Sequence, residues 1–405
     1  MKFVWFMDRR QFSLATLALL GTAAHCSGEP WENEDGSWTV AVIGHTGRGD
    51  YGHGLDTVWS HLPKTTVKGV ADADEAGLAR ELSKLGLDSV KGYSDYRIML
   101  RELQPDIVAI CPRHVDQHRD MILAAVNAGA RGIYVEKPFV QNLQQLDEVV
   151  KACRESGTKL AVAHRNRYHP VLKTIDGLIG DGKIGRLLEI RGRGKGDGRG
   201  GAEDLWVLGS HVLNLMAYFG GSPTTCSATL YRQGRRVVNE DRVLGREGLG
   251  WLAGDELHAN YRFARGVTGY FDSIANDGTQ NQGFGLSLVG SQGRIQIWCD
   301  DSPLAMIFPG NPFESAASSN KALPISTAGV GLIEPIHGLH RKLHQHVIPV
   351  EDLLDSIRCD REPICGLEDA GATVEMICGV FESHRLGRTV KFPLVNRDHP
   401  LSKFG

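Results

Sequence analysis

The stretch SWTVAVIGHTGRG, residues 37–49, joins a short run of apolar and β-branched residues to a turn rich in glycine. Such a run is typical of a buried strand, because β-branched side chains favour extended backbone. Glycine permits positive φ angles in the turn and leaves its backbone bare. A phosphate group can then approach the unpaired N–H groups at the start of a following helix. The stretch therefore predicts a strand, a phosphate-binding turn and a helix.

The turn departs in one position from the usual spacing of a dinucleotide-binding loop. Gly44 opens it, Thr46 stands where a second glycine is common, and Gly47 follows one position later. A glycine-rich hairpin would look similar, so the turn needs support from its surroundings. The residues predicted to bind cofactor here are Gly44, Thr46, Gly47, Arg48 and Gly49.

That support comes from an acidic residue at the end of the next predicted strand, Thr65–Ala71. The carboxylate of Asp72 can accept hydrogen bonds from both ribose hydroxyls of NAD. It would repel a 2′-phosphate, and Ala73 offers no cation to receive one. The sequence therefore favours NAD over NADP. The alternative is that Asp72 only caps the helix that begins near Asp74.

Strands and helices continue to alternate through the first half of the chain. The further elements expected there are helices over residues 75–85, 95–103 and 119–128 and strands over 107–111 and 132–135. This rhythm is typical of a parallel, doubly wound sheet. We therefore expect an α/β protein whose residues 37–160 form an NAD-binding Rossmann domain.

Longer β-rich stretches follow from residue 161 onward. The strands expected are 187–193, 256–263, 268–273, 286–290 and 294–298, with short turns between neighbours. These stretches predict a second, α+β domain over residues 161–395, built on an open, largely antiparallel sheet. A chain of 405 residues has room for two such domains.

The overall composition narrows the function. The formal net charge is -3 and charged residues make up 23%, so no basic field is available to attract a phosphate backbone. A glycine- and arginine-rich run, residues 191–201, has no interleaved aromatic side chains and is interpreted as an active-site loop. We expect no nucleic-acid partner and no membrane-spanning helix.

Residues 1–28 resemble a twin-arginine signal peptide. Arg9 and Arg10 precede an apolar run, Leu14–Leu20, and the small residues at 21–24 offer a cleavage site. The run is too short to span a bilayer, which takes about 20 residues. We therefore expect a periplasmic or otherwise exported protein. If the leader carries no signal, the protein is cytoplasmic.

Cysteines and histidines give no metal motif. The eight cysteines form no C-x-x-C pair and are expected to be mostly buried thiols, although Cys359 and Cys365 could pair. Four histidines crowd one short segment: His337, His340, His344 and His346. Because no carboxylate or cysteine completes a site, substrate contact or plain exposure is favoured over zinc.

Several segments, taken in order, resemble the Gfo/Idh/MocA family of oxidoreductases. Tyr134–Pro138 contains the family's E-K-P signature at the end of a strand, and Arg165–Pro170 resembles its N-x-R-x-x-P segment. The segments Pro112–His118, Gly180–Gly185, Val350–Pro363 and Glu375–Gly387 are also similar to family segments. The resemblance runs from about Ser37 to Pro393.

The resemblance implies a role for each matching residue. Lys137 matches the lysine beside the nicotinamide, Glu136 its acidic partner, and His211 the histidine proposed as acid/base. Pro112 and His118 belong to the loop expected at the cofactor. The substrate contacts implied are Arg167, Tyr168 and Asn214. Taken singly, Lys137 could equally be a surface lysine and His211 a satisfied helix histidine.

One departure from the family concerns the partner of His211. The family usually has an aspartate one helical turn earlier, where this chain has Val207. Asp204 could replace it if the loop before it folds over the site. The proton relay is therefore expected to use Asp204, Lys137 or a water.

The resemblance implies an NAD-dependent oxidoreductase that acts on CH–OH groups of a sugar or polyol. It also implies a homo-oligomer formed through the second sheet. Two alternatives stay open: a glycosidase that retains NAD and works by transient oxidation, and a non-catalytic NAD-binding sensor. Lys137 and His211 argue against the sensor.

Overall fold

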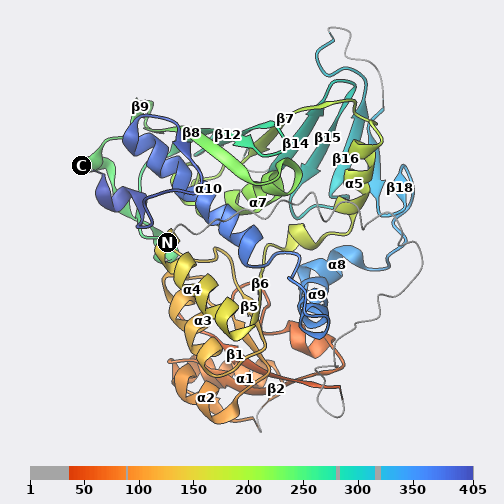
Figure 1. Cartoon of the computed structure of the whole chain (residues 1–405). Helices are drawn as coiled ribbons and strands as arrows, with labels where there is room; N and C mark the ends of the chain where they lie inside the picture. The colour runs from red at the N-terminus through yellow and green to blue at the C-terminus, as the bar shows by residue number, and fades with distance from the viewer. Residues whose placement is uncertain (1–35, 88–89, 280–282, 315–320, 405) are drawn as a thin grey trace.

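The computed structural model describes residues 36–87, 90–279, 283–314 and 321–404. Two sheets form its framework, one in the lower and one in the upper half of Figure 1. Helices α7 (Gly209–Gly220) and α10 (Leu367–Leu386) lie between the halves. The site is built where these halves meet.

The first sheet is fully parallel, with strand order β3-β2-β1-β4-β5-β6. Its strands are β1 (Trp38–Ile43), β2 (Thr65–Ala71), β3 (Gly92–Tyr93), β4 (Ile107–Ile110), β5 (Gly132–Val135) and β6 (Lys159–Val162). This is the doubly wound order of a dinucleotide-binding Rossmann domain. It confirms the fold class predicted for the first half.

Alternate side chains of each strand enter two different cores. Ile43 faces α2 (Tyr96–Leu103), α3 (His118–Asn127) and α4 (Leu143–Ser156), whereas Val42 faces the opposite layer. That layer contains α1 (Glu75–Lys84), η2 (Val58–His61) and α9 (Val347–Arg358). Helix α9, from the second predicted domain, therefore packs against the Rossmann sheet of the first.

No α-helix joins β1 to β2, contrary to the prediction. Residues 51–57 form turns that lead into the short η2. Gly49, Gly52 and Gly54 have φ angles of 93°, 65° and 97°. This left-handed backbone cannot continue a right-handed helix, so a ligand would meet the bare turn itself instead of a helix N-terminus.

The second sheet is mixed, and its only parallel pair among the described strands is β7 with β13. Its strands are β7 (Leu187–Arg193), β8 (Pro223–Arg232), β9 (Arg235–Arg236), β12 (Glu256–Phe263), β13 (Thr268–Ile274), β14 (Gly285–Gly290), β15 (Gly293–Trp298), β16 (Ala305–Pro309), β17 (Leu323–Ser326), β18 (Gly329–Val330) and β19 (Val390–Lys391). The prediction of a largely antiparallel sheet is confirmed.

The remaining elements surround this sheet. They are α5 (Val171–Gly180), α6 (Ala202–Val207), α8 (Leu339–His344), the hairpin β10 (Val243–Leu244) and β11 (Trp251–Leu252), and the 3₁₀ turns η3 (Val115–Gln117), η4 (Arg165–Tyr168), η5 (Asn239–Asp241), η6 (Arg246–Gly248) and η7 (Pro400–Lys403). The family-like segments Val350–Pro363 and Glu375–Gly387 fall on the last two helices. The first of these, α9, ends at Arg358, before Pro363, and α10 already begins at Leu367.

Six described cysteines are buried free thiols, as expected for most of them: Cys111, Cys153, Cys226, Cys299, Cys365 and Cys378. Cys359 is disulfide-bonded, but because Cys365 is free, the pair considered from the sequence does not form. Within the described ranges, no helix is long and apolar enough to cross a membrane.

Phe271 fixes the packing of the helix that carries the site against the second sheet. Its ring is 0% exposed, and a Cβ at Gly209 would lie 2.8 Å from its Cζ atom. We expect Phe271→Ala to lower the free energy of unfolding by about 3–5 kcal/mol, because it leaves a cavity in the core. Chemical denaturation checks this value. The control is Phe313→Ala at a 66% exposed position, and equal losses for both variants would contradict the packing described.

Candidate functional site

The glycine turn forms an open cradle at the carboxyl end of β1. Gly47 has a φ of 79°, and no atom lies within 4 Å of where its Cβ would be. Gly49 is tightly enclosed instead, since its Cβ would lie 2.3 Å from the backbone nitrogen of Arg113. The bare backbone at Gly47 therefore faces free space, as the binding of a pyrophosphate requires.

The side chain of Asp72 contacts this turn. Its carboxylate accepts hydrogen bonds from the Thr46 backbone nitrogen (3.0 and 3.1 Å) and from the Thr46 hydroxyl (2.7 Å). Asp74, and not Asp72, caps the following helix by accepting from the Gly77 nitrogen. When a ribose binds Asp72, its hydroxyls would replace the Thr46 hydroxyl as hydrogen-bond donors to the carboxylate. The acidic residue and the cradle together fit NAD.

The loop after β4 is tied to the glycine turn. Arg48 forms an ion pair with Asp116 at 2.6 Å, and the ring of His45 contacts the Gln117 side chain. His118 is fully buried, with its two ring nitrogens at the carbonyl oxygens of Pro112 (2.7 Å) and Phe139 (3.0 Å). His118 therefore holds the loop in place, and neither ring nitrogen is left for a cofactor.

Glu136 is locked in place beneath the cradle. It accepts hydrogen bonds from the backbone nitrogens of His53 (3.0 Å) and Lys137 (2.7 Å), and it contacts the ring of His53. Burial alone would raise the pKa of Glu136, but the bond with His53 and the charge of Lys137 hold this pKa well below its usual range. Glu136 is therefore a fixed negative charge beside Lys137.

Lys137 follows β5 directly and reaches the second domain. Its ammonium donates a hydrogen bond to the Val207 carbonyl oxygen at 3.2 Å, and the residue is only 7% exposed. Burial lowers the pKa of Lys137, although the charge of Glu136 acts in the opposite direction. The helix break after Val207 thus brings a catalytic candidate of one domain to a backbone acceptor of the other.

His211, on α7, packs against a histidine that the sequence analysis did not assign to the site. The ring centroids of His211 and His164 lie 5.1 Å apart with an edge-to-face angle of 90°. Burial and the charge of Lys137 lower the pKa of His164 to about 3. Burial and the neighbouring His164 also lower the pKa of His211. Both rings are therefore neutral at physiological pH, and a neutral imidazole can accept a proton.

Asp204 does not take the place of the missing aspartate. Its carboxylate accepts hydrogen bonds from the Ser273 hydroxyl (2.7 Å) and the Lys195 backbone nitrogen (3.1 Å). Burial raises the pKa of Asp204 to about 7. The side chain is directed at β13 and the turn after β7, so of the three relay groups considered from the sequence, Asp204 is bound elsewhere.

The three predicted substrate contacts are occupied within the protein. Arg167 forms an ion pair with Asp369 at 2.7 Å, and the Tyr168 hydroxyl donates to the Val162 carbonyl at 3.2 Å. Asn214 donates to the Thr373 hydroxyl at 3.1 Å and to the Asp369 carbonyl at 3.2 Å. These bonds join η4 and α7 to neighbouring elements, so the three residues stabilise the elements that carry the site.

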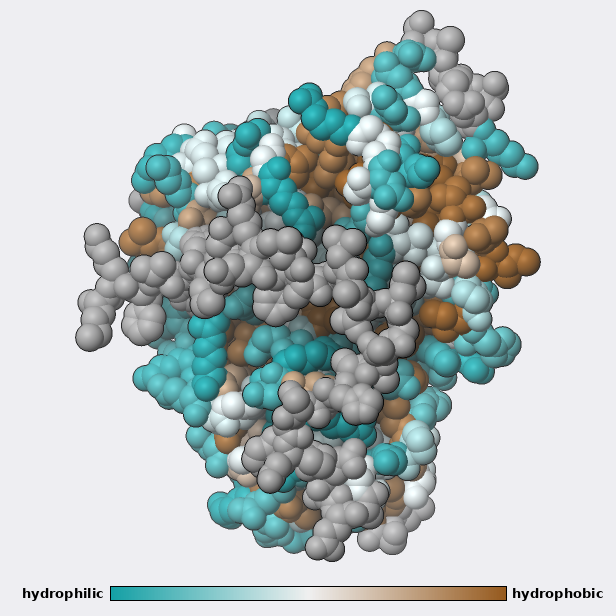
Figure 2. Space-filling view, turned by 45° about the vertical axis from the view of Figure 1, so that its right-hand side comes forward, coloured by the Kyte–Doolittle hydropathy of each residue, from teal (hydrophilic) through white to brown (hydrophobic). Residues whose placement is uncertain are grey.

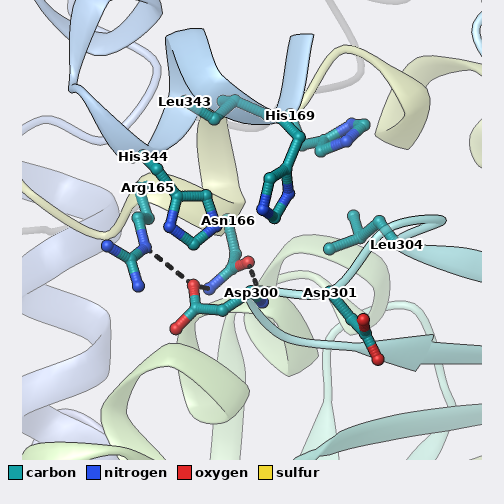
Figure 3. A pocket seen from close by; sticks show the side chains of 9 residues that line it. Arg165, Asn166, His169, Asp300, Asp301, Leu304, Leu343 and His344 are labelled. Atoms are coloured by element: carbon teal, nitrogen blue, oxygen red, sulfur yellow. Dashed lines mark hydrogen bonds and ion pairs between the residues drawn. The ribbon is translucent and has the colours of Figure 1, made fainter. Parts of the chain in front are cut away.

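Arg165 and Asn166, which precede Arg167 in the sequence, line a pocket (Figure 3). Arg165 and Asn166 donate hydrogen bonds to Oδ1 of Asp300 at 2.7 and 3.0 Å. The pocket lies between η4, α8 and the turn after β15. His164 and Arg165 lie two and three residues beyond the end of β6, and the rule that ligands gather at strand carboxyl ends could have indicated them. Nothing in the local sequence indicated Asp300.

The histidines of residues 337–346 have separate environments. His340 and His344 stack with ring centroids 4.1 Å apart, while the His346 ring meets the Tyr134 hydroxyl at 2.6 Å. His337 is exposed. Among the described residues, no group of three or more His, Cys, Asp or Glu side chains could hold a metal ion.

The fold and the site together define a two-domain, dinucleotide-binding protein with a Lys–His cluster at the carboxyl edge of its Rossmann sheet. Two family models match the chain: "Oxidoreductase family, NAD-binding Rossmann fold" over residues 38–164 and "Oxidoreductase family, C-terminal alpha/beta domain" over residues 177–392. The chain therefore belongs to the Gfo/Idh/MocA oxidoreductase family, and its first domain is the NAD-binding domain of that family.

Curated relatives are distant. The chain is 26% identical over 196 residues to D-apiose dehydrogenase of Paraburkholderia graminis, an alignment that covers 45% of this chain and 50% of that protein. It is 24% identical over 258 residues to levoglucosan dehydrogenase of Pseudarthrobacter phenanthrenivorans, covering 56% and 64%. The chain thus spans about half the length of the curated relatives it matches.

Solved structures share the fold across almost the whole chain. The complex of a levoglucosan dehydrogenase with NADH and levoglucosan has a TM-score of 0.70 at 19% identity, covering 88% of this chain and 100% of that one. The WlbA dehydrogenase of Bordetella pertussis, with NADH and UDP-GlcNAcA, has a TM-score of 0.65 at 16% identity, covering 88% and 99%. At this identity the likeness establishes the fold.

The two glycines of the cradle should respond differently to alanine. We expect Gly49→Ala to lower the free energy of unfolding by about 2 kcal/mol or more, because a positive φ is strained and the Cβ collides with the Arg113 backbone. Gly47→Ala has the strain without the collision and should lose about 1 kcal/mol. Denaturation of the cofactor-free protein measures both values. A larger loss for Gly47→Ala would contradict the cradle geometry.

Proposed function

We propose that the protein is an NAD-dependent oxidoreductase that oxidises a CH–OH group of a sugar or polyol. The observation that carries this proposal is the grouping of Lys137, His164 and His211 at the carboxyl edge of a sheet whose cradle fits NAD. The dehydrogenase names of relatives, including those for D-apiose and levoglucosan, support the substrate class.

The residues of the site divide the chemistry between them. When bound, NAD supplies the acceptor for the hydride that leaves the substrate carbon. The neutral ring of His211 accepts the proton of the hydroxyl, and the Lys137 ammonium stabilises negative charge on that oxygen as it develops. The two transfers turn an alcohol into a carbonyl compound. His164 holds the His211 ring from the side.

Substitution of the two central residues tests this proposal. We expect Lys137→Ala and His211→Ala each to lower turnover by about 10²- to 10⁴-fold, because a positioned acid/base contributes that factor. NAD⁺ reduction is measured with a panel that includes levoglucosan, D-apiose and myo-inositol. Folding and NADH binding should be retained. The matched controls are Lys151→Ala and His61→Ala, both at exposed positions.

The wild-type protein in the same assays separates the alternatives. Cleavage of aryl glycosides without net NADH formation would identify the glycosidase. Tight NADH binding with neither activity would identify the sensor. Rates like those of the wild type in both central variants would show that the active site lies elsewhere.

NAD in preference to NADP is part of the proposal, supported by Asp72 and Ala73. Because the Asp72 carboxylate is buried at the glycine turn, it would repel a 2′-phosphate. We expect NADH to bind at least about tenfold more tightly than NADPH, a difference of about 1.4 kcal/mol. Calorimetric titration measures both affinities. Asp72→Ser should narrow the difference, and equal binding by the wild type would contradict the assignment.

A homo-oligomer through the outer face of the second sheet also belongs to the proposal. In Figure 1 the helices α7 and α10 cover only the inner face. Tyr270 on β13 is 36% exposed, and the guanidinium of Arg191 lies over its ring, 5.2 Å from the ring centroid. Apolar surface shows among polar side chains over the upper half of the molecule in Figure 2. Analytical ultracentrifugation would detect the oligomer, and a monomer at micromolar concentration would contradict it.

Export remains a proposal that rests on Arg9 and Arg10, which lie outside the described residues. Outside the cytoplasm no NAD pool can be assumed. An exported enzyme would acquire NAD before export, retain it and restore it in each cycle. Assay of the purified mature protein for nucleotide after extensive dialysis checks this, and an empty protein found in the cytoplasm would contradict it.

A further inference from the structure

Three hydrogen bonds fix the position of Asp300 in the turn after β15. Both Arg165 and Asn166 donate to its Oδ1 atom, and its backbone nitrogen donates to the Asn166 side-chain oxygen at 2.8 Å. Its φ angle is 65°, a left-handed conformation that side chains other than glycine seldom adopt. Strained residues fixed in this way concentrate at functional sites.

The other carboxylate oxygen of Asp300 has no hydrogen-bond partner in the described part of the chain. Figure 3 shows it pointing away from both Arg165 and Asn166. The side chain is 23% exposed, so a ligand can reach it. Burial alone would raise the pKa of Asp300, but Arg165, His211 and Asn166 hold this pKa well below its usual range. The free oxygen is therefore an ionised acceptor at every physiological pH.

The turn that carries Asp300 is connected to the catalytic candidates on two sides. Arg165, which donates to Asp300, follows His164, whose ring packs against that of His211 at 5.1 Å. The backbone nitrogen of Cys299 donates to the carbonyl oxygen of Phe284, whose ring lies 6.2 Å from that of His211. The groups around Asp300 are Arg165, Asn166, His211, His344 and Lys137. An acceptor at this place can bind a hydroxyl adjacent to the one that is oxidised.

We propose that Asp300 is a specificity-determining residue that binds a hydroxyl of an uncharged sugar or polyol through its free carboxylate oxygen. This assignment rests on the proposed function and names the substrate class of the same site. Arg165 and Asn166 are positioning residues that aim the carboxylate. The second domain supplies the contact through the turn after β15, while Lys137 comes from the first domain.

The charges around the pocket favour an uncharged substrate. The only cation that lines it, among the described residues, is Arg165, whose charge is balanced by Asp300. Burial lowers the pKa of His169 to about 4 and also lowers that of His344, so both rings are neutral near pH 7. Asp301 adds a further negative charge. The Lys137 ammonium is already held by the Glu136 charge and the Val207 carbonyl oxygen, so an aldonate, uronate or sugar phosphate at this pocket would meet mainly the repulsion of Asp300 and Asp301.

Two measurements on the full-length protein test the assignment. In the first, NADH-loaded wild-type protein is titrated with levoglucosan, D-xylose and myo-inositol, and with D-gluconate and D-glucuronate. We expect binding of at least one uncharged probe, and about tenfold or more weaker binding of both anions. This arm needs no variant and no turnover.

In the second, Asp300→Asn is compared with the wild type. We expect kcat/KM for the best uncharged substrate to fall by about 10- to 100-fold, the usual effect of losing a hydrogen bond to a charged group. The factor should be the same from about pH 6 to pH 9, because the carboxylate stays ionised there. NADH affinity should not change. The control is Asp147→Asn on α4, which weakens the ion pair between Asp147 and Arg397.

The outcomes separate this inference from the proposed function. Binding of uncharged sugars that weakens in Asp300→Asn, without any NAD⁺ reduction by the wild type, would support Asp300 and overturn the proposed activity. Preferred binding of the anions, no binding of any uncharged probe, or unchanged kcat/KM in Asp300→Asn would overturn the role of Asp300. A loss of the acidic limb of the pH profile would identify Asp300 as an acid/base instead.

Discussion

The ammonium of Lys137 is buried where the two domains meet, and the arrangement of the site follows from that burial. A buried cation needs a hydrogen-bond acceptor and a nearby negative charge. The Val207 carbonyl supplies the acceptor at 3.2 Å, and Glu136, itself fixed by His53, supplies the charge. Burial, together with neighbouring positive charge, lowers the pKa of both His164 and His211, so the two rings stay neutral. The cluster thus contains one cation and two neutral imidazole rings.

The cofactor cradle depends on backbone conformation more than on side chains. Three glycines with positive φ replace the first helix of the Rossmann unit with turns. The sheet face that this helix would have covered is instead packed by η2 and by α9, which comes from far along the chain. The NAD-binding domain is therefore completed by residues of the C-terminal half, and the two halves of the chain share one core.

Val207 stands where the resemblance implies an aspartate, and a carboxylate from elsewhere in the chain lies near His211 instead. That carboxylate is Asp300, in the turn after β15, whereas Asp204 accepts a hydrogen bond from the Ser273 hydroxyl. Val207 contributes its carbonyl oxygen to Lys137, a role that any residue type at this position can fill. A side chain can thus be replaced while the backbone contact is kept.

The sequence by itself determined the parallel sheet, the glycine turn with Asp72 and the largely antiparallel character of the second sheet. These features follow from local periodicity and from the backbone freedom of glycine, whereas Lys137 and His211 were indicated by the resemblance to the family. Tertiary structure alone decided that Arg167, Tyr168, Asn214, Asp204 and His118 bond within the protein. It also decided that the His164 ring packs against His211 and that Arg165 and Asp300 line the pocket. The physical reason is that neighbouring residues on a 3₁₀ turn point in different directions. Which residues of this turn face the pocket depends on how α7, α8 and the second sheet pack against the first domain. No local sequence pattern encodes that packing.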